Sequence, residues 1–303
     1  MSMKLLGRGS TFLFCAACAI FQIATAPNAL AGAILGPNLS TFALLGGAGV
    51  AINGTGSVIT GSIGGCCTAT AVTGVIPTNF TDSGGTVYNT GSLPTATETA
   101  ANAELNTAIT ALNNMTPTFE GTLNNITLGP GVYSIDATPL TGTLTLDGAG
   151  NANALWVFLE SSSLTTASSS SVIVQGTGAG AGVYWVMTTS ASLGSNSVFE
   201  GNILANQGIL VGTNVTDPCG RLLTQVAAVT LTGTDTIGIG NSCTGALAGS
   251  NGLSGGGTLV NGVITPLPFA GIATPEPGTF FLLVPGLAAL GILRKRSRSK
   301  SHA

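Results

Sequence analysis

Short runs of threonine, serine and asparagine recur along this sequence, each between two aliphatic residues, and they are its main candidates for binding chemistry. The recurring unit is an aliphatic residue, two to four small polar residues with Gly beside Thr or Ser, and a second aliphatic residue. Copies begin at Ile52, Leu140, Leu193, Leu210 and Leu231, and a looser copy runs from Leu164 to Val172. Hydroxyl and amide groups form hydrogen bonds without carrying charge, so such an array suits ordered water or sugar hydroxyls.

The spacing of these units predicts a stack of similar coils. Ala167, Gly194, Gly212 and Gly233 are 27, 18 and 21 positions apart, and spacings near twenty are typical of solenoids in which each coil adds one strand to a common face. Because side chains alternate across a strand, the bracketing aliphatic residues should point into the core and the short polar residues should point outward. Stacked strands would repeat them about every 4.8 Å.

We therefore expect a flat, rigid and uncharged surface of hydroxyl and methyl groups, since β-branched threonine has few side-chain rotamers. The residues predicted to form it are Thr55, Thr166, Ser168, Ser195, Asn196, Thr213, Asn214, Thr232 and Thr234.

One segment, residues 95–114, predicts an α-helix. Thr95 and Glu98 have the spacing of a capping box, and Pro117 ends the helical pattern. One apolar face is expected, formed by Ala101, Leu105, Ala108, Ile109 and Leu112. Almost all other segments alternate apolar and small polar residues between glycines, as strands do.

The distribution of charge excludes several classes of function. Of eight basic residues, only Arg221 lies between the two apolar terminal segments, so no basic patch is available for nucleic acid. The single histidine is His302, and no Cys or His spacing suits a metal, so we expect no cofactor. We do not expect an enzyme, although convergence of Asp147, Glu160 and Glu200 in space is left open. The aromatic residues Tyr133, Trp156, Tyr184 and Trp185 lie in aliphatic runs and are expected in the core.

The two ends of the chain have the features of export signals. Residues 1–31 combine a basic start, an apolar stretch and an A-x-A cleavage site, as in a secretory signal peptide to be removed by signal peptidase. Residues 274–303 contain Pro275, Glu276 and Pro277, a short apolar segment at 280–293 and a basic cluster. This order resembles the PEP-CTERM sorting signal of Gram-negative bacteria, which implies processing by an exosortase and a place at the cell surface or outside the cell. An ordinary tail anchor is the alternative.

Four cysteines remain in the central domain, residues 32–273. Export permits disulfides, and four cysteines allow three pairings. Cys219 with Cys243 is the favoured pair because it would bracket the strand-like run at 222–237. The neighbouring Cys66 and Cys67 are left as either a vicinal disulfide or free thiols.

The central domain resembles a family of ice-binding proteins from cold-adapted bacteria, fungi and algae over roughly residues 34–239. The matching segments, in order, are 42–46, 58–64, the Ala-rich helix, 128–133, 144–148, 156–158, 183–186, 201–205 and 220–223. The resemblance implies a mainly β fold, a discontinuous right-handed β-helix of triangular section with one long α-helix packed alongside. Some relatives carry a Thr, Ala or Gly, any residue, Thr or Asn motif on the ice-binding face. Residues 166–169 fit it with a final Ser, and residues 232–235 end with Asp235, an unusual charge for such a face.

Two functions remain open. The favoured one is a monomeric, exported protein that adsorbs to the ice crystal surface through a flat Thr, Ser and Asn face, inhibiting ice growth and recrystallisation. Scarce charge supports this function because charged side chains hold hydration shells of their own. The alternative is a structural or adhesive extracellular protein whose hydroxyl-rich face binds exopolysaccharide.

Overall fold

Three sets of parallel strands and one long helix make up the computed structural model, which describes residues 32–66, 72–74, 80–82, 84–88 and 95–272. The expectation of a mainly β fold with one helix is confirmed. The signal peptide, the sorting motif, the apolar segment at 280–293 and Cys67 lie outside the described residues. Within the described part of the chain, no helix has the length and hydropathy needed to cross a bilayer.

The largest set, here named the covered sheet, has eight strands. Its order is β8 (Thr118–Gly121), β10 (Gly131–Ile135), β12 (Leu155–Glu160), β15 (Gly182–Met187), β17 (Gly201–Ala205), β20 (Gly220–Thr224), β2 (Phe42–Gly46) and β5 (Ser62–Gly65). Each pair of neighbours in this sheet is parallel.

A second set of six parallel strands is named the open sheet. Its order is β13 (Leu164–Thr165), β16 (Ala191–Leu193), β18 (Ile209–Val211), β21 (Ala228–Leu231), β3 (Gly49–Ile52) and β6 (Val72–Thr73). The strands are short, and every second residue is buried, as expected for a sheet that packs one face on a core.

The third set, named the split sheet, has two parts joined by single bridges through Val198 to Ser171 and Thr216. One part contains β9 (Ile126–Leu128), β11 (Thr143–Asn151) and β14 (Ser171–Thr177), and the other contains β19 (Thr216–Asp217), β22 (Thr236–Gly238), β4 (Ser57–Thr60) and β7 (Phe80–Asp82).

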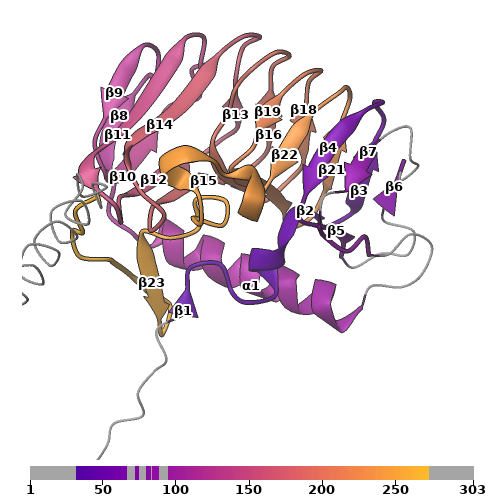
Figure 1. The fold of residues 1–303 in the computed structure, drawn as a ribbon, viewed down its shortest axis with the longest axis horizontal. Helices are drawn as coiled ribbons and strands as arrows, with labels where there is room; N and C mark the ends of the chain where they lie inside the picture. Colours follow the sequence, from indigo (N-terminus) through magenta and orange to yellow (C-terminus); the bar gives the residue numbers. More distant parts are fainter. Residues whose placement is uncertain (1–31, 67–71, 75–79, 83, 89–94, 273–303) are drawn as a thin grey trace, which may run out of the picture. The chain divides into compact units, whose positions relative to one another are not determined.

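Successive strands of a coil pass from the covered sheet to the open sheet and then to the split sheet, as β20, β21 and β22 do. The coils stack side by side (Figure 1). Their order is discontinuous in sequence: β2, β3 and β4 of the N-terminal coil pair with β20, β21 and β22 of a late coil. The chain reaches the far end of the stack through the helix and then winds back.

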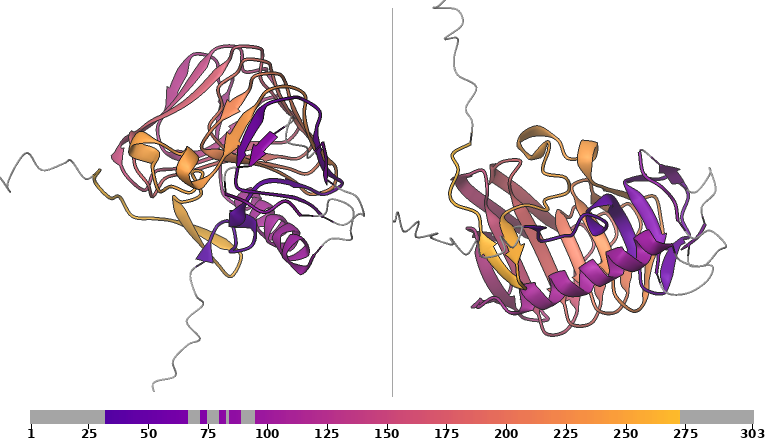
Figure 2. Two further views of the ribbon diagram at one scale, coloured as in Figure 1. Left: turned by 45° about the vertical axis from the view of Figure 1, so that its right-hand side comes forward. Right: turned by 90° about the horizontal axis from the view of Figure 1, so that it is seen from below.

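The helix α1 (Ala96–Asn113) runs along the stack, across the strands of the covered sheet (Figure 2). Thr95 is its N-cap, and the Glu98 side chain accepts from the Thr95 N–H at 2.7 Å, so the predicted capping box is confirmed. The five residues predicted for its apolar face are all buried. They pack with Leu155, Val157 and Tyr184 from the covered sheet, and strands β12 and β15 are therefore buried on both faces.

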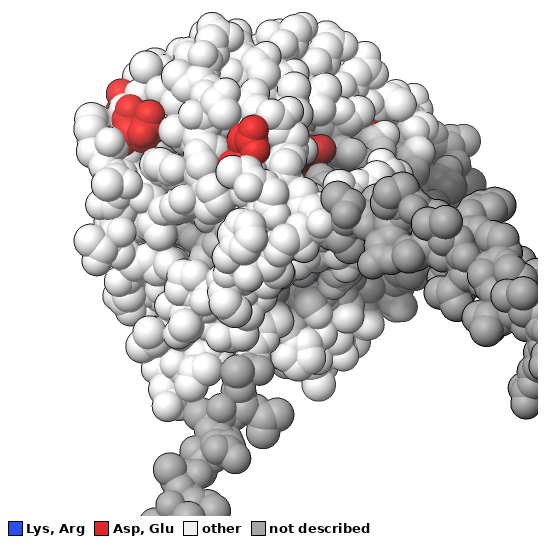
Figure 3. Space-filling view, turned by 60° about the vertical axis from the view of Figure 1, so that its left-hand side comes forward, with Lys and Arg blue, Asp and Glu red and all other residues white. Residues whose placement is uncertain are grey.

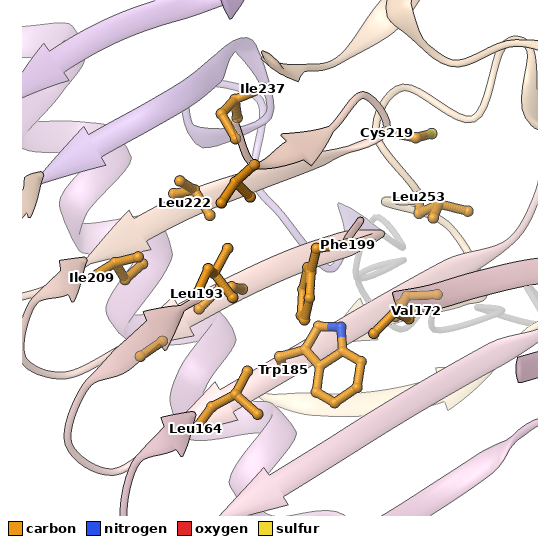
Figure 4. Packing of buried hydrophobic residues seen from close by; sticks show 14 of the residues in the cluster. Leu164, Val172, Trp185, Leu193, Phe199, Ile209, Cys219, Leu222, Ile237 and Leu253 are labelled. Atoms are coloured by element: carbon orange, nitrogen blue, oxygen red, sulfur yellow. The ribbon is translucent and has the colours of Figure 1, made fainter. Parts of the chain in front are cut away.

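The space between the three sheets is filled by aliphatic and aromatic side chains (Figure 4). Trp185 stacks on Phe158 with ring centroids 4.0 Å apart and packs against Phe199 at 5.1 Å. Trp156, Tyr184 and Trp185 are fully buried and Tyr133 is partly buried against the same core, as the sequence predicts. These rings are therefore not exposed platforms for sugars.

The remaining elements lie outside the coils. An antiparallel sheet joins β1 (Gly32–Ala33), β23 (Gly257–Val260) and β24 (Val263–Pro266). Short 3-10 helices occur at η1 (Leu39–Thr41), η2 (Gly240–Ser242) and η3 (Gly245–Leu247).

Candidate functional site

The predicted site residues gather at one edge of the stack, where each coil turns from the open sheet into the split sheet. These turns, residues 53–57, 166–170, 194–197, 212–215 and 232–235, are here named the turn ladder. The prediction that each repeat forms one strand is wrong, because the chain bends in the middle of every unit. Ser169, Asn196 and Asn214 have φ values of 63°, 58° and 59°, and this left-handed backbone interrupts a strand.

Many polar side chains of the turn ladder form hydrogen bonds with a neighbouring turn. Thr166 Oγ1 accepts from the Gly194 N–H at 2.9 Å, and Ser195 Oγ accepts from the Thr213 N–H at 3.1 Å. Asn214 Nδ2 donates to Asn196 Oδ1 at 3.2 Å. Thr232 Oγ1 donates to the Val211 carbonyl and Thr234 Oγ1 to the Thr55 carbonyl. Four of these five bonds join a side chain to a backbone group of a neighbouring turn, and they add to backbone bonds that continue through the turns, such as Asn196 N–H to the Thr213 carbonyl at 2.9 Å.

The bend also changes which side chains face the solvent. Thr166, predicted to lie on the surface, is only 3% exposed. Val58 and Val198, predicted to point into the core, are 37% and 41% exposed on the split sheet. Thr166 is buried because the alternation of Leu164 and Thr165 continues through it. The two valines are exposed because alternation does not hold through the turn that precedes them. Thr55, Ser168, Asn196, Thr213, Asn214, Thr232 and Thr234 are exposed, and Ser195 is half-buried.

Asp235 is not an exposed charge. Its side chain is buried, and Oδ1 accepts from the Val215 N–H at 2.9 Å. Burial raises the pKa of this carboxyl, against the lowering effect of its backbone hydrogen bonds. The Asp235 side chain therefore stabilises the turn by its hydrogen bond to Val215, and the fourth position of this motif copy does not face the solvent.

The open sheet supplies an in-register row of outward side chains that the repeat pattern did not identify. Neighbours along this row, in register on adjacent strands, are Thr165, Ser192, Leu210, Thr230, Ala51 and Thr73. Each described residue on either side of these positions within the strands is buried. The sequence does contain a pattern for this row, since most of these positions hold a short residue between buried aliphatic residues. The prediction was instead based on the repeats centred on glycine, which form the turns.

A second row lies two positions earlier in the coils, at Ser163, Ser190, Gly208 and Ala228, all of intermediate exposure. With the first row it forms a shallow surface of small side chains beside the turn ladder. None of the described residues in the two rows carries a charge. Charge is sparse elsewhere too, and Figure 3 shows one side of the molecule on which a few acidic groups are separated by uncharged surface.

The other two sheets differ from the open sheet in what covers them or is exposed on them. The helix overlies the covered sheet. On the split sheet, Ile173 and Val198 are exposed beside Asp147 and Glu200, and the η2 and η3 segment packs against β4 and β14. The split sheet has a row of comparable length, Thr143, Ser171, Val198, Thr216, Thr236 and Val58, but this row crosses the break between the two parts of the sheet at Val198. The row of the open sheet runs through one continuous set of paired strands.

Comparisons with known proteins identify the family of this chain. Residues 44–237 match the ice-binding-like family. The chain belongs to this family. It is 40% identical over 210 residues to an ice-binding protein of Nostoc sp. (strain HG1), which covers 67% of this chain and 72% of that protein.

Solved structures of other ice-binding proteins share the fold. The ice-binding protein of the Antarctic ascomycete Antarctomyces psychrotrophicus has a TM-score of 0.60 and 37% identity, covering 68% of this chain and 97% of that one. The ice-binding protein LeIBP of an Arctic yeast, whose structure was described as a basis of its antifreeze activity, has a TM-score of 0.56 and 26% identity, covering 68% and 94%.

In this member of the ice-binding-like family, Asp147, Glu160 and Glu200 do not all converge on one site. Among the residues that the structure describes, no group of three His, Cys, Asp or Glu side chains is placed to hold a metal. Glu160 ends β12 in the covered sheet, whereas Asp147 and Glu200 belong to the split sheet region. Asp147 accepts from the exposed Gln175 amide at 3.2 Å, and Glu200 accepts from the Val174 N–H at 2.8 Å.

A buried polar cluster around Arg221 was not anticipated. Arg221 is fully buried and donates to the Asn202 side chain and to the carbonyls of Gly252 and Ser40. Asn202 donates in turn to the carbonyls of Val183 and Leu253. Burial lowers the pKa of Arg221 to about 10, against the opposing effects of Tyr184 and Asp217, so the guanidinium stays protonated at neutral pH.

The same region contains a disulfide between Cys219 and Cys243, the pairing favoured by the sequence. Cys243 Sγ accepts from the Gly252 N–H at 3.2 Å, which links the disulfide to the segment held by Arg221. Cys66 is also disulfide-bonded. In this member of the family, a chain poor in charge therefore places its one central basic residue beside a disulfide, where both fix a segment without regular secondary structure.

Proposed function

We propose that this protein adsorbs to ice through the outward face of the open sheet, with the exposed residues of the turn ladder along one border. The observation that carries the proposal is the in-register row from Thr165 to Thr73, in which no side chain is charged and all except Leu210 are small. Adjacent strands repeat about every 4.8 Å, so the row presents hydroxyl and methyl groups at a regular spacing.

Rigidity supports the same function. The residues next to each outward side chain are buried in the core, and threonine is stiff at χ1. The hydrogen bonds of the turn ladder fix the border of the face. A surface that is already ordered loses little conformational entropy on contact, so many weak contacts add up without a strong individual one. The relatives named as ice-binding proteins support this assignment.

Substitution of Ser192 by Tyr tests the face directly. Ser192 is half-exposed at the middle of the row, and a tyrosine ring there would hold a flat lattice plane away from its neighbours. We expect thermal hysteresis and inhibition of ice recrystallisation to fall at least tenfold. The temperature at which the protein unfolds should not change. The matched control is Thr145→Tyr, at a half-exposed outward position of β11 on the split sheet, which should retain full activity.

Two other outcomes would overturn the proposal. Full activity in Ser192→Tyr with loss in Thr145→Tyr would place the ice contact on the split sheet. Absence of any activity in the unmodified protein, together with retention on an immobilised exopolysaccharide, would favour the adhesive function instead.

The proposal includes export and a specific winding of the coils. The signal peptide at 1–31 and the motif Pro275, Glu276 and Pro277 support secretion by a Gram-negative bacterium with processing by an exosortase. The three parallel sheets that each coil visits in turn support a β-helix of triangular section. The preference of connections between parallel strands for one hand supports right-handed winding. Mass spectrometry of the mature protein tests the first part, since cleavage should leave termini near Gly32 and the Pro-Glu-Pro motif.

A further inference from the structure

Leu210 departs from the pattern of the open sheet. It lies at the middle of the outward row, in register with Ser192 on one side and Thr230 on the other. Its side chain is 48% exposed, and it is the one large aliphatic side chain directed outward from the described strands of this sheet. The other described members of the row are Thr, Ser and Ala.

The surroundings of Leu210 leave the side chain standing above a low surface. Ile209 and Val211, its neighbours in β18, are buried and fix the backbone register. Gly208, two positions earlier in the same coil, has no side chain. A shallow hollow beside it is lined by residues that include Ser190, Gly208 and Ala228.

We infer that Leu210 sets the strength of ice adsorption by interrupting the row of small side chains. This inference rests on the proposed function of the open sheet. A leucine side chain extends one carbon beyond threonine and has no hydroxyl. A flat lattice plane that meets its terminal methyl groups is held away from Ser192 and Thr230, so the face makes contact as two shorter segments.

The position itself does not require leucine for folding. Leu210 is outward, and an exposed substitution away from the core usually changes stability by no more than about 0.5 kcal/mol. Threonine is also well suited to a strand. Leu210 is 48% exposed and lies on the surface, so a smaller residue there leaves no enclosed cavity.

The test compares thermal hysteresis of the purified full-length protein with Leu210→Thr and Leu210→Val. We expect at least a twofold increase for Leu210→Thr and a smaller increase for Leu210→Val, whose side chain is shorter by one carbon. Val198→Thr is the matched control, because Val198 is 41% exposed on the split sheet, and it should not change the activity.

Equal or lower activity in Leu210→Thr, with the fold confirmed by circular dichroism, would overturn the inference. If Leu210→Thr fails to fold, the decision rests on Leu210→Val in the same way. Ser192→Tyr separates this failure from failure of the proposed function. Loss of activity in Ser192→Tyr with no gain in the Leu210 variants would reject the inference alone, whereas full activity in Ser192→Tyr would reject the face.

Discussion

Arg221 Nη1 donates a buried hydrogen bond of 2.8 Å to Oδ1 of Asn202 on the neighbouring strand of the covered sheet. Through Nη2 the same guanidinium reaches the carbonyl of Ser40, 181 positions earlier in the sequence. It thereby joins the N-terminal segment, two late coils and the segment around Gly252. Five donors in a planar fork make arginine suited to such a junction.

Replacement of Arg221 by Met should destabilise the protein by about 3–5 kcal/mol, because buried acceptors would lose a charged donor. Urea unfolding followed by circular dichroism measures the change. Gln207→Met, at an exposed position, is the control and should stay within about 0.5 kcal/mol. A cost below 1 kcal/mol for Arg221→Met would show that the cluster does not hold these segments together.

Stability should decrease as pH rises from about 4.5 through 7. Burial raises the pKa of Glu200 to about 7, against the lowering effect of the Val174 N–H. Burial and the charge of Glu200 also raise the pKa of Asp217 well above its ordinary value. The folded state then binds more protons than the unfolded state across this range, so ionisation at higher pH opposes folding. The stabilisation of the folded state by protonated Glu200 is fully present below about pH 4.5 and is lost once the pH passes 7.

The pKa shift of Glu200 corresponds to a decrease of about 3 kcal/mol in the free energy of unfolding across this pH range. Urea unfolding at pH 5 and pH 8 should show the difference, and Glu200→Gln, which keeps an acceptor for the Val174 N–H, should reduce the slope. An equally steep slope in Glu200→Gln would assign the pH dependence to other groups.

Loss of the disulfide between Cys219 and Cys243 should destabilise the chain without abolishing ice activity. The bond joins residues 24 positions apart, and closing a loop of this size contributes about 3 kcal/mol. The double variant Cys219→Ser with Cys243→Ser should therefore unfold at lower urea. Its thermal hysteresis at 0 °C should remain, because the bond does not lie in the open sheet. Loss of activity in a variant still folded at that temperature would contradict this separation.

Asn214 should be replaceable by Gly but not by Val. Its φ of 59° is in the left-handed region, which costs a β-branched residue more than asparagine or glycine. We expect Asn214→Val to lose about 1–2 kcal/mol and Asn214→Gly to lose less than half as much, measured by thermal unfolding. Equal losses would indicate that the bond to Asn196, rather than the backbone conformation, determines the preference.

Thr213 tests whether the turn ladder borders the ice-contacting surface. It is exposed, and its backbone N–H donates to Ser195. Thr213→Tyr should retain the fold and lower thermal hysteresis severalfold, with a smaller loss than Ser192→Tyr because it lies at the edge of the face. A larger loss for Thr213→Tyr than for Ser192→Tyr would move the centre of the site to the turns.

Local patterns in the sequence were enough to predict the helix and the uncharged, small polar character of the surface. The capping box of Thr95 and Glu98 and the spacing of Ala101, Leu105 and Leu112 depend on residues close in sequence, so the helix was predicted to within one residue at each end. The scarcity of charge and the repeated small polar residues are properties of composition.

Which sheet those residues face was decided by the tertiary structure. A strand and a tight turn share the pattern of aliphatic, small polar and aliphatic residues, so the sequence did not show that Ser169, Asn196 and Asn214 bend the chain. The pairing of β3 with β21 depends on residues far apart in sequence, and it sets Ala51 beside Thr230. The burial of Arg221 likewise follows from Ser40 and Gly252 meeting it in the folded chain, since no local pattern specifies partners that distant.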